Sequence, residues 1–351
     1  MINDKNKKQE GGDSSSNIQA ENVNVYQGLS YKDVKDIATD IFSSNFLQVK
    51  NEAAQIATER AEEITGKIVD QLEKKSPESL QEFSQPGMQD ALFTAQKEYA
   101  KSGDAELGDL LVDIIVDRAE TTQRNMLQIV LDESLHVAPK LTIEQLDTLT
   151  LLFLLIRTRR LNVKNYEDLK LYFENHVFPF VDNLLKDHQH YNYLEYLRCG
   201  QIRTGNYGEL EKRLRDTYKG FFAKGFTEEE LASEFDNTDN FKDLIIACLH
   251  EPSKFQIGVF DDNTLDVRMT EKGLSIDEQN KLKQFFEKTT MTNQEIKDLL
   301  IAFSPKMEVL FEVWKDSSFN KFELSSVGIA IAHANYRRRT GETMDLSIWI
   351  K

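Results

Sequence analysis

From Tyr31 to Leu72, hydrophobic residues recur at steps of three and four, the spacing of one face of an α-helix. No proline interrupts this region before Pro77. An unbroken helix of about forty residues would be about 60 Å long, at about 1.5 Å per residue. Alanines near its middle, between Ala53 and Ala61, allow another helix to approach closely. The pattern predicts a long spine helix, which is typical of a scaffold or of an oligomer interface.

The segment just before this helix favours an assembly element. Ser30 and Asp33 form a capping-box pattern that marks the helix start. The preceding run, residues 17–26, alternates in two phases and is either two short strands around a turn or one irregular edge strand. Because a strand this short is not stable alone, we expect it to pair with the rest of the fold or with another copy of the chain. The candidate assembly residues are Val23, Val25, Tyr26, Tyr31, Val34, Phe42 and Phe46.

The rest of the chain reads as helices with little β-structure. Helices are expected near residues 89–100, 107–118 and 121–136, after capping boxes at Thr142, Thr227, Ser275 and Thr292, and from Ser326 to Arg339 before Gly341. Residues 255–260 and 265–268 around Asp261-Asp262-Asn263-Thr264 predict a hairpin, and residues 346–350 predict a terminal strand. The predicted fold class is therefore mainly α, with a spine helix and helical bundle followed by an α-rich region with minor β-structure.

Three segments follow from this pattern. Residues 1–16 are almost devoid of apolar side chains and are expected to form a disordered leader. Residues 17–139 are expected to form an N-terminal strand and long-helix domain. Residues 140–351 are expected to form an α-rich C-terminal domain with minor β-structure.

Composition narrows the classes of function. The 351 residues carry a formal charge of -16, which argues against broad nucleic-acid binding because a phosphate-contacting surface needs excess Lys and Arg. The two cysteines, Cys199 and Cys248, lie too far apart for a disulfide framework or a paired zinc motif. The longest apolar run, Leu151 to Ile156, is far short of a membrane span. These features favour a cytoplasmic protein without a membrane span.

Candidate chemistry is sparse. His188 and His190, with Cys199 further on, are the best metal candidates, but two histidines two residues apart share a face only on a strand. Cys248 and His250 have the same weakness. Asp261 and Asp262 could form an acid–base pair, but aspartates are also common at turns. The chain has no G-x-S-x-G, P-loop, Rossmann glycine or H-E-x-x-H motif. We expect no metal and no cofactor.

Two basic runs are interpreted as helix C-termini, where positive charge is stabilising: Arg157 to Arg160, and Arg337 to Arg339. The latter could alternatively meet a phosphate. Tyr191, Tyr193 and Tyr196 with Arg198 have the composition of a protein-binding hot spot and equally that of a packed core.

Two segments carry a family resemblance. Asn22 to Lys35, continuing through Asp40-Ile41-Phe42 and Asn45-Phe46, resembles an N-terminal module that precedes several kinds of bacterial protein. Ser325 to Asn335, followed by Leu346 to Ile350, resembles the C-terminal signature of an uncharacterised bacterial family that begins with this module. With Cys199-Gly200 and residues 221–226, the resemblance spans most of the chain. It implies an association with accessory bacterial genes, including phage-defence neighbourhoods, and it assigns no activity and no site residue.

The sequence therefore favours a non-enzymatic, self-assembling interaction protein, with phage defence as the setting that the resemblance suggests. A homo-oligomer and a protein partner are expected. The alternatives are an enzyme, for example a hydrolase or nucleotide-acting effector, and a nucleotide-responsive sensor, either with a site in the C-terminal half. Whether the protein is an enzyme stays open at this stage.

Overall fold

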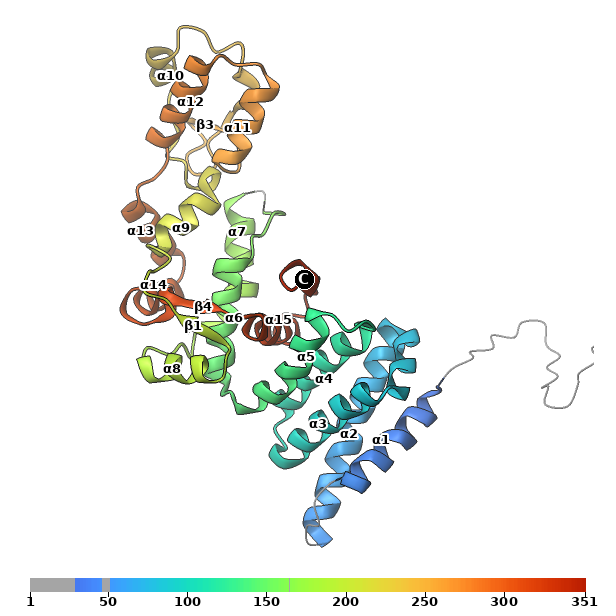
Figure 1. The fold of residues 1–351 in the computed structure, drawn as a ribbon. Helices are drawn as coiled ribbons and strands as arrows, with labels where there is room; N and C mark the ends of the chain where they lie inside the picture. Colours follow the sequence, from blue (N-terminus) through green and yellow to red (C-terminus); the bar gives the residue numbers. More distant parts are fainter. Residues whose placement is uncertain (1–28, 46–50, 164) are drawn as a thin grey trace, which may run out of the picture.

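The computed structural model describes residues 29–45, 51–163 and 165–351, and it is mainly α-helical (Figure 1). The α-helices are α1 (Tyr31–Asn45), α2 (Asn51–Lys75), α3 (Pro86–Ser102), α4 (Ala105–Glu120), α5 (Met126–Val137), α6 (Ile143–Arg157), α7 (Tyr166–Tyr172), α8 (His188–Tyr196), α9 (Leu210–Thr217), α10 (Glu228–Glu234), α11 (Asp262–Glu271), α12 (Ile276–Lys288), α13 (Asn293–Phe303), α14 (Pro305–Asp316) and α15 (Ser326–Thr340). The predicted fold class is confirmed.

Short helical turns and strands connect these helices. The turns are η1 (Pro77–Ser84), η2 (Ala138–Lys140), the π-helical η3 (Phe173–Val177), η4 (Phe178–Phe180), η5 (Lys219–Phe222), η6 (Lys242–Leu244), η7 (Phe319–Lys321) and η8 (Leu346–Ile348). Strand β1 (Gly200–Ile202) pairs antiparallel with β4 (Phe322–Leu324), so that Gly200 lies opposite Leu324. Strand β2 (Ile245–Ala247) pairs antiparallel with β3 (Phe255–Ile257), with Ile245 opposite Ile257.

Most of the molecule, which we call the trunk, shares one hydrophobic core. This core includes buried residues from Val34 in α1 to Ile350 near the C-terminus. It therefore crosses the predicted boundary between residues 139 and 140, because α15 packs against α4, α5 and α6 together. Elements from both ends of the sequence build this single core.

Helix α15 lies at the centre of the trunk, between α6 and the helices of the N-terminal bundle (Figure 1). Residues 328–337 are all buried, so this helix has no solvent-facing stripe and must satisfy neighbours on every side. At Gly328, a Cβ atom would lie 1.9 Å from the backbone oxygen of Cys199. Only glycine permits this approach, which explains the small residue near the helix start.

Three charged or polar contacts fix α15 against its neighbours. The Arg337 guanidinium donates to Oδ1 of Asp113 at 3.0 Å and to Oδ1 of Asp117 at 2.6 Å, both on α4. On the opposite side, Asp147 of α6 accepts from Arg339 at 3.3 Å, and burial raises the pKa of this carboxyl to about 6. Arg338 pairs with Glu106 at 3.3 Å. The three consecutive arginines thus tie α15 to α4 and α6.

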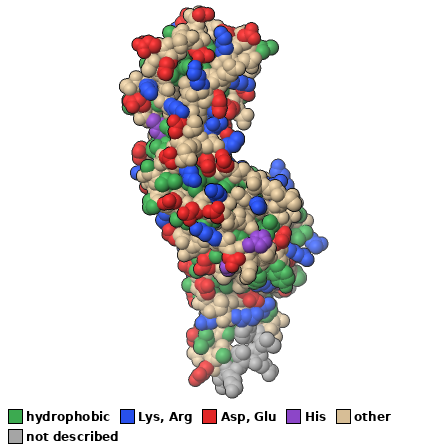
Figure 2. All heavy atoms as spheres, turned by 90° about the vertical axis from the view of Figure 1, so that its left-hand side faces the viewer, with side chains coloured by type: hydrophobic (Ala, Val, Ile, Leu, Met, Phe, Trp, Pro, Cys, Tyr) green, Lys and Arg blue, Asp and Glu red, His purple; other side chains and the backbone are tan. Residues whose placement is uncertain are grey.

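A second, smaller core lies in the distal lobe, residues 226–288, which projects from one end of the trunk (Figure 1). Phe226, Phe241, Leu265, Leu282 and Phe286 are among its buried residues. Acidic and basic side chains are intermixed on the face of the lobe that Figure 2 shows. The distal lobe thus has an apolar core of its own. It joins the trunk through Leu249 and Phe260, which pack against the trunk core, and through the polar contacts described below.

The predicted spine helix is wrong as a single element. Helix α1 ends at Asn45, α2 begins at Asn51, and the two lie side by side (Figure 1). The Asn45 side chain donates to the carbonyl of Ile41 at 2.8 Å, so a polar residue satisfies the end of α1. Hydrophobic spacing reports which face of a helix is buried and does not report whether the chain turns back, so the pattern continued through both helices.

Two predicted β-elements are also wrong. Asp261 accepts from the backbone N–H of Thr264 at 2.7 Å and begins helix α11, so residues 265–268 are not a strand. Strand β3 pairs with β2 instead. At the C-terminus, Leu346 and Ile350 are both buried around the turn η8, a spacing that suits one helical turn better than a strand.

The local helix signals are confirmed. The capping boxes at Thr142, Thr227, Ser275 and Thr292 have both of their hydrogen bonds. At Ser30, the backbone N–H donates to Asp33 at 2.8 Å, and the hydroxyl accepts from the Asp33 N–H at 3.3 Å. The predicted last helix ends at Gly341, which has φ of 72°.

We expect Arg337→Met to lower the free energy of unfolding by about 3–5 kcal/mol, because it leaves two buried or half-buried carboxylates without their cation. Urea unfolding followed by circular dichroism measures this change. Arg268→Met is the control, since Arg268 pairs at 3.2 Å with Glu271 on the solvent-exposed face of α11. Its effect should stay within about 0.5 kcal/mol. Equal effects of the two substitutions would contradict a central role for Arg337.

Candidate binding cleft between the trunk and the distal lobe

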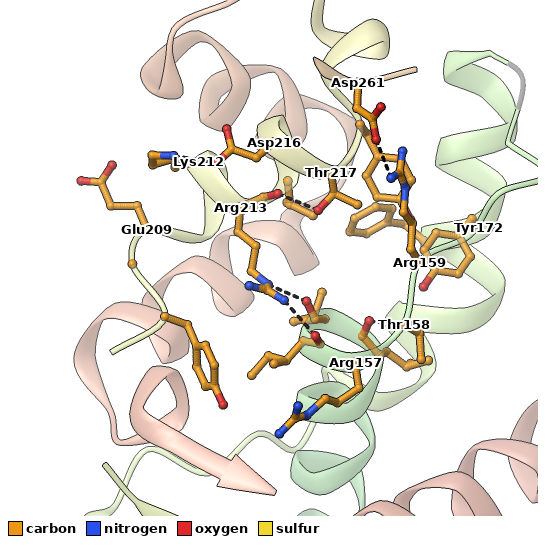
Figure 3. A pocket seen from close by; sticks show the side chains of 18 of the residues that line it. Arg157, Thr158, Arg159, Tyr172, Glu209, Lys212, Arg213, Asp216, Thr217 and Asp261 are labelled. Carbon is orange, nitrogen blue, oxygen red and sulfur yellow. Dashed lines mark hydrogen bonds and ion pairs between the residues drawn. The ribbon is translucent and has the colours of Figure 1, made fainter. Parts of the chain in front are cut away.

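A cleft of about 740 Å³ lies where the distal lobe joins the trunk (Figure 3). One wall is the C-terminal end of α6 with the residues after it, and the other is α9 with the loop before it. Tyr172 and Phe173 also line the cleft, and Asp261 and Asn263 at the start of α11 contribute from the distal lobe. The volume is within the range of about 300–1,000 Å³ that is usual for small-molecule sites.

Arg213 joins the two walls. Its Nε donates to the carbonyl of Leu155 at 2.7 Å, and its Nη2 donates to that of Ile156 at 2.9 Å (Figure 3). These carbonyls belong to the last turn of α6, which has no later N–H groups to satisfy it. Desolvation lowers the pKa of Arg213 from its ordinary value, but the group stays protonated at neutral pH. Arg213 is thus a fixed positive charge inside the cleft.

Arg159 connects the trunk to the distal lobe. Its guanidinium lies 2.5 Å from Oδ2 of Asp261 (Figure 3). It also lies 4.2 Å from the ring centroid of Phe260. Burial acts to raise the pKa of Asp261, but the hydrogen bonds from Thr264 and the contact with Arg159 outweigh it and lower this pKa. We call this contact the lobe latch.

Buried Lys219 supports the same junction. Its ammonium lies 2.7 Å from a carboxylate oxygen of Asp262 in α11 and 2.7 Å from one of Glu287 in α12. Arg215 of α9 also contacts Glu287, at 2.8 Å. The contacts made by Arg159, Lys219 and Arg215 hold α11 and α12 against the elements that form the cleft.

Two cations in the cleft are only weakly engaged. Arg157 lies 3.5 Å from Glu323, and Lys212 lies 2.6 Å from Asp216, with 57% of the Lys212 side chain exposed. Ion pairs exposed to this extent contribute little to stability, so their partners can exchange at low cost. These two side chains come from opposite walls and are available to a ligand.

The lining carries more positive than negative charge. Four of its residues are basic and three are acidic, whereas the whole chain has a formal charge of -16. The basic residues are Arg157, Arg159, Lys212 and Arg213, and the acidic ones are Glu209, Asp216 and Asp261. A hollow with this charge balance raises the local concentration of anions.

Half-buried Tyr207 adds an aromatic ring to the lining, and the guanidinium groups of Arg203 and Arg213 lie over this ring, 5.5 Å and 5.8 Å from its centroid. Tyr218 is more constrained, because its hydroxyl accepts from the backbone N–H of Arg160 at 3.1 Å. The cleft therefore combines aromatic faces with cations.

The histidine and cysteine candidates do not form a site in the part of the chain that the structure describes. Among those residues, no three metal-ligating side chains gather around one point. His188 contacts the Ser318 hydroxyl at 2.7 Å, and Cys199 is buried, which raises the pKa of its thiol to about 12. Cys248 is buried, and Nε2 of His250 lies 2.5 Å from the carbonyl of Phe221. Each is explained by local packing.

The aromatic and arginine candidates have separate places. Tyr191 is buried, whereas Tyr193 and Tyr196 are 40% and 79% exposed and their rings stack at 6.3 Å. Arg337 to Arg339 are held by the ion pairs to α4 and α6 described above. The helix-end interpretation of this run found the right role, a structural one, but missed these partners.

The candidate assembly residues lie in two groups. Val23, Val25, Tyr26 and Phe46 lie outside the described residues. Val34 and Phe42 are buried against the chain's own helices, with Phe42 6.4 Å from Phe93, and Tyr31 is half-buried. The burial of Val34 and Phe42 is thus explained within one chain.

The cleft was missed by the sequence interpretation. The run from Arg157 to Arg160 predicts a helix end, and Asp261 predicts a turn or, with Asp262, an acid–base pair. The Asp-x-x-Thr spacing from Asp261 to Thr264 is a capping pattern that could have revealed the start of α11. Nothing local indicates that residues 154–159, 206–218 and 261–263 meet.

A model of an uncharacterised protein family matches residues 28–350. The chain belongs to this family. The match includes both walls of the cleft, the distal lobe and α15. Comparison with curated proteins and with solved structures gave no match. Membership in the family confirms that the chain belongs to an uncharacterised family, and it assigns no activity to the cleft.

No helix within residues 29–45, 51–163 and 165–351 is both long and apolar enough to cross a membrane.

We expect Asp261→Asn to destabilise the distal lobe by about 1–2 kcal/mol, because asparagine keeps the helix cap but loses the charge that faces Arg159. Hydrogen exchange of the α11 amides, measured by mass spectrometry, should become faster. Because the pKa of Asp261 is lowered in the folded state, its carboxylate stabilises the fold at any pH above 3.8, the ordinary pKa of aspartate. This stabilisation is lost as pH falls through the folded-state pKa, so the variant and the parent should converge there.

Asp266→Asn is the control for this substitution. Asp266 lies on the same helix and pairs with Lys283 at 2.7 Å, but both side chains are about half exposed. If Asp266→Asn accelerates exchange in α11 as much as Asp261→Asn, the lobe latch has no special role.

Proposed function

We propose that the protein is a binding protein whose cleft takes an anionic aromatic ligand of the nucleotide class. The observation that carries this proposal is the meeting of cations from two walls and a lobe junction in one hollow of about 740 Å³. Phosphate groups would contact Arg157, whose ion pair with half-buried Glu323 is long at 3.5 Å, and Lys212, whose ion pair with Asp216 is exposed. Arg203 and Arg213 already lie over the ring of Tyr207, so a base would stack on this ring by displacing one of the two guanidinium groups.

The lobe latch gives such binding a structural consequence. Arg159 and Asp261 line the cleft and also join the trunk to the distal lobe. A ligand between the walls would favour one position of the distal lobe over others, because it binds that position more tightly. This coupling supports the sensor form of the proposal over simple storage of a ligand.

We expect ATP or GTP to bind saturably, and we expect Arg157→Ala/Lys212→Ala to weaken that binding by about 10–100-fold through loss of two charged contacts. Isothermal titration calorimetry measures the affinities. The control is Arg268→Ala/Lys186→Ala, which removes the same charge. Arg268 pairs with Glu271 at 3.2 Å and Lys186 pairs with Glu312 at 2.8 Å, in exposed ion pairs that do not line the cleft. The control should stay within about threefold of the parent.

Two outcomes would contradict this function. Absence of saturable binding at millimolar nucleotide would remove the proposal, and equal weakening in the control variant would reduce it to general electrostatic attraction. Release of phosphate from bound nucleotide would instead favour the alternative of a nucleotide-acting enzyme with its site in the same cleft.

Self-assembly through a protein surface is a second proposal, favoured by the stacked and exposed Tyr193 and Tyr196 on α8. The phage-defence setting and a protein partner also stay proposals, which a pull-down from the native host during phage challenge would test. Neither depends on the cleft being occupied.

We expect size-exclusion chromatography with light scattering to show an oligomer, and we expect deletion of residues 17–26 to reduce its size more than it reduces helicity. Tyr196→Ser tests the α8 surface in the same assay. A monomer at all concentrations would contradict self-assembly. Equal loss of size and helicity on deletion would mean that the segment belongs to the ordinary core.

A further inference from the structure

A second cavity, of about 400 Å³, lies on the trunk between α2, α4, α15 and the segment 343–347. It is distinct from the cleft and shares no lining residue with it. His333 of α15 and Asp117 of α4 face each other here, with Nδ1 of His333 3.9 Å from Oδ2 of Asp117. The side chain of His333 is almost fully buried, with 1% of the residue exposed.

The hydrogen bonds of His333 determine what its second nitrogen can do. Its Nε2 lies 2.8 Å from the backbone carbonyl of Met344. A carbonyl only accepts, so Nε2 carries the proton and donates. Desolvation lowers the pKa of His333 although Asp117 acts to raise it, so the ring is neutral at pH 7. Nδ1 is therefore an acceptor with a free lone pair.

Asp117 presents a second acceptor to the same space. Its Oδ1 accepts from Nη1 of Arg337 at 2.6 Å. Within the described part of the chain, neither Oδ2 of Asp117 nor Nδ1 of His333 has a hydrogen-bond partner, and both atoms are buried. Two buried acceptors that face each other are unfavourable unless a donor lies between them. One nitrogen or oxygen atom with two protons can reach both, since hydrogen bonds span about 2.7–3.2 Å.

The rest of the lining favours a cationic donor with an aliphatic chain. Asp117, Glu120 and Asp345 outnumber the cations Lys75 and Arg337, and each cation already has a carboxylate partner. Leu127 and Leu346 supply apolar surface. A metal ion is a poorer fit, because the described residues place no three metal ligands together.

We propose that this cavity binds the primary ammonium group of a small aliphatic amine, whose N–H groups donate to Oδ2 of Asp117 and Nδ1 of His333. The probe is n-butylammonium, and tetramethylammonium is the matched ligand control because it has the same charge and no N–H donor. We expect calorimetry on the full chain without nucleotide to show saturable binding of n-butylammonium at millimolar concentration and at least about tenfold weaker binding of tetramethylammonium.

Asp117→Asn tests the acceptor pair while keeping the contact with Arg337 that stabilises the fold. The asparagine oxygen still accepts from Arg337, while its NH₂ group donates to Nδ1 of His333 and supplies the missing donor internally. We expect this variant to weaken n-butylammonium binding at least about tenfold. Asp113→Asn is the matched control, since Asp113 lies one turn away on α4 and also contacts Arg337 but does not line this cavity. It should bind within about twofold of the parent.

His333→Phe is a second variant, for use if Asp117→Asn does not fold. It keeps an aromatic ring beside Phe153 and Trp349 and removes the ring acceptor, so binding should again be lost. Any of four results would overturn the proposal: no saturable binding, which means that water alone fills the cavity; equal binding of tetramethylammonium; equal loss in Asp113→Asn; or saturable Zn²⁺ binding in place of the amine.

Discussion

The buried contact of Arg337 with Asp113 and Asp117 is the constraint on which the trunk depends. A guanidinium with so little exposure must have its donors satisfied, and both carboxylates lie one turn apart on a single helix. The contact therefore fixes both the distance and the register between α15 and α4. Because α15 is buried on every side, this register also sets where α5 and α6 can pack.

The same register positions both cavities. One carboxylate oxygen of Asp117 accepts from Arg337, and the other faces His333. The pair of acceptors therefore results from the same ion contact that positions α15. On the far side of α15, α6 packs along its length and ends at Arg157, where the cleft begins. A change in the α4–α15 contact would thus be felt at the second cavity directly and at the cleft through α6.

A structural feature could be predicted from the sequence where the residues that cause it lie close together in the chain. Capping boxes at Thr142, Thr227, Ser275 and Thr292 involve residues three apart, so the sequence shows them directly. The separation of α1 from α2 and the helical start at Asp261 do not follow from hydrophobic spacing, because this spacing reports which residues are buried and not the direction of the chain. The cleft and the acceptor pair could not be read at all, since Arg159 meets Asp261 and Asp117 meets His333 only after the helices have packed.

The cleft and the second cavity differ in the physical reason for expecting a ligand. In the cleft, Arg157 and Lys212 form weak or exposed ion pairs and can exchange a carboxylate for a ligand anion. The argument for a ligand there depends on the attraction of anions to these cations. At His333 and Asp117, two buried acceptors have no donor among the described residues, so the argument depends on the free-energy cost of desolvating acceptors that form no hydrogen bond. The second reason is the more demanding one, because a buried acceptor must be satisfied by something. The need for a donor at His333 and Asp117 would remain even if the distal lobe moved and the cleft changed its shape.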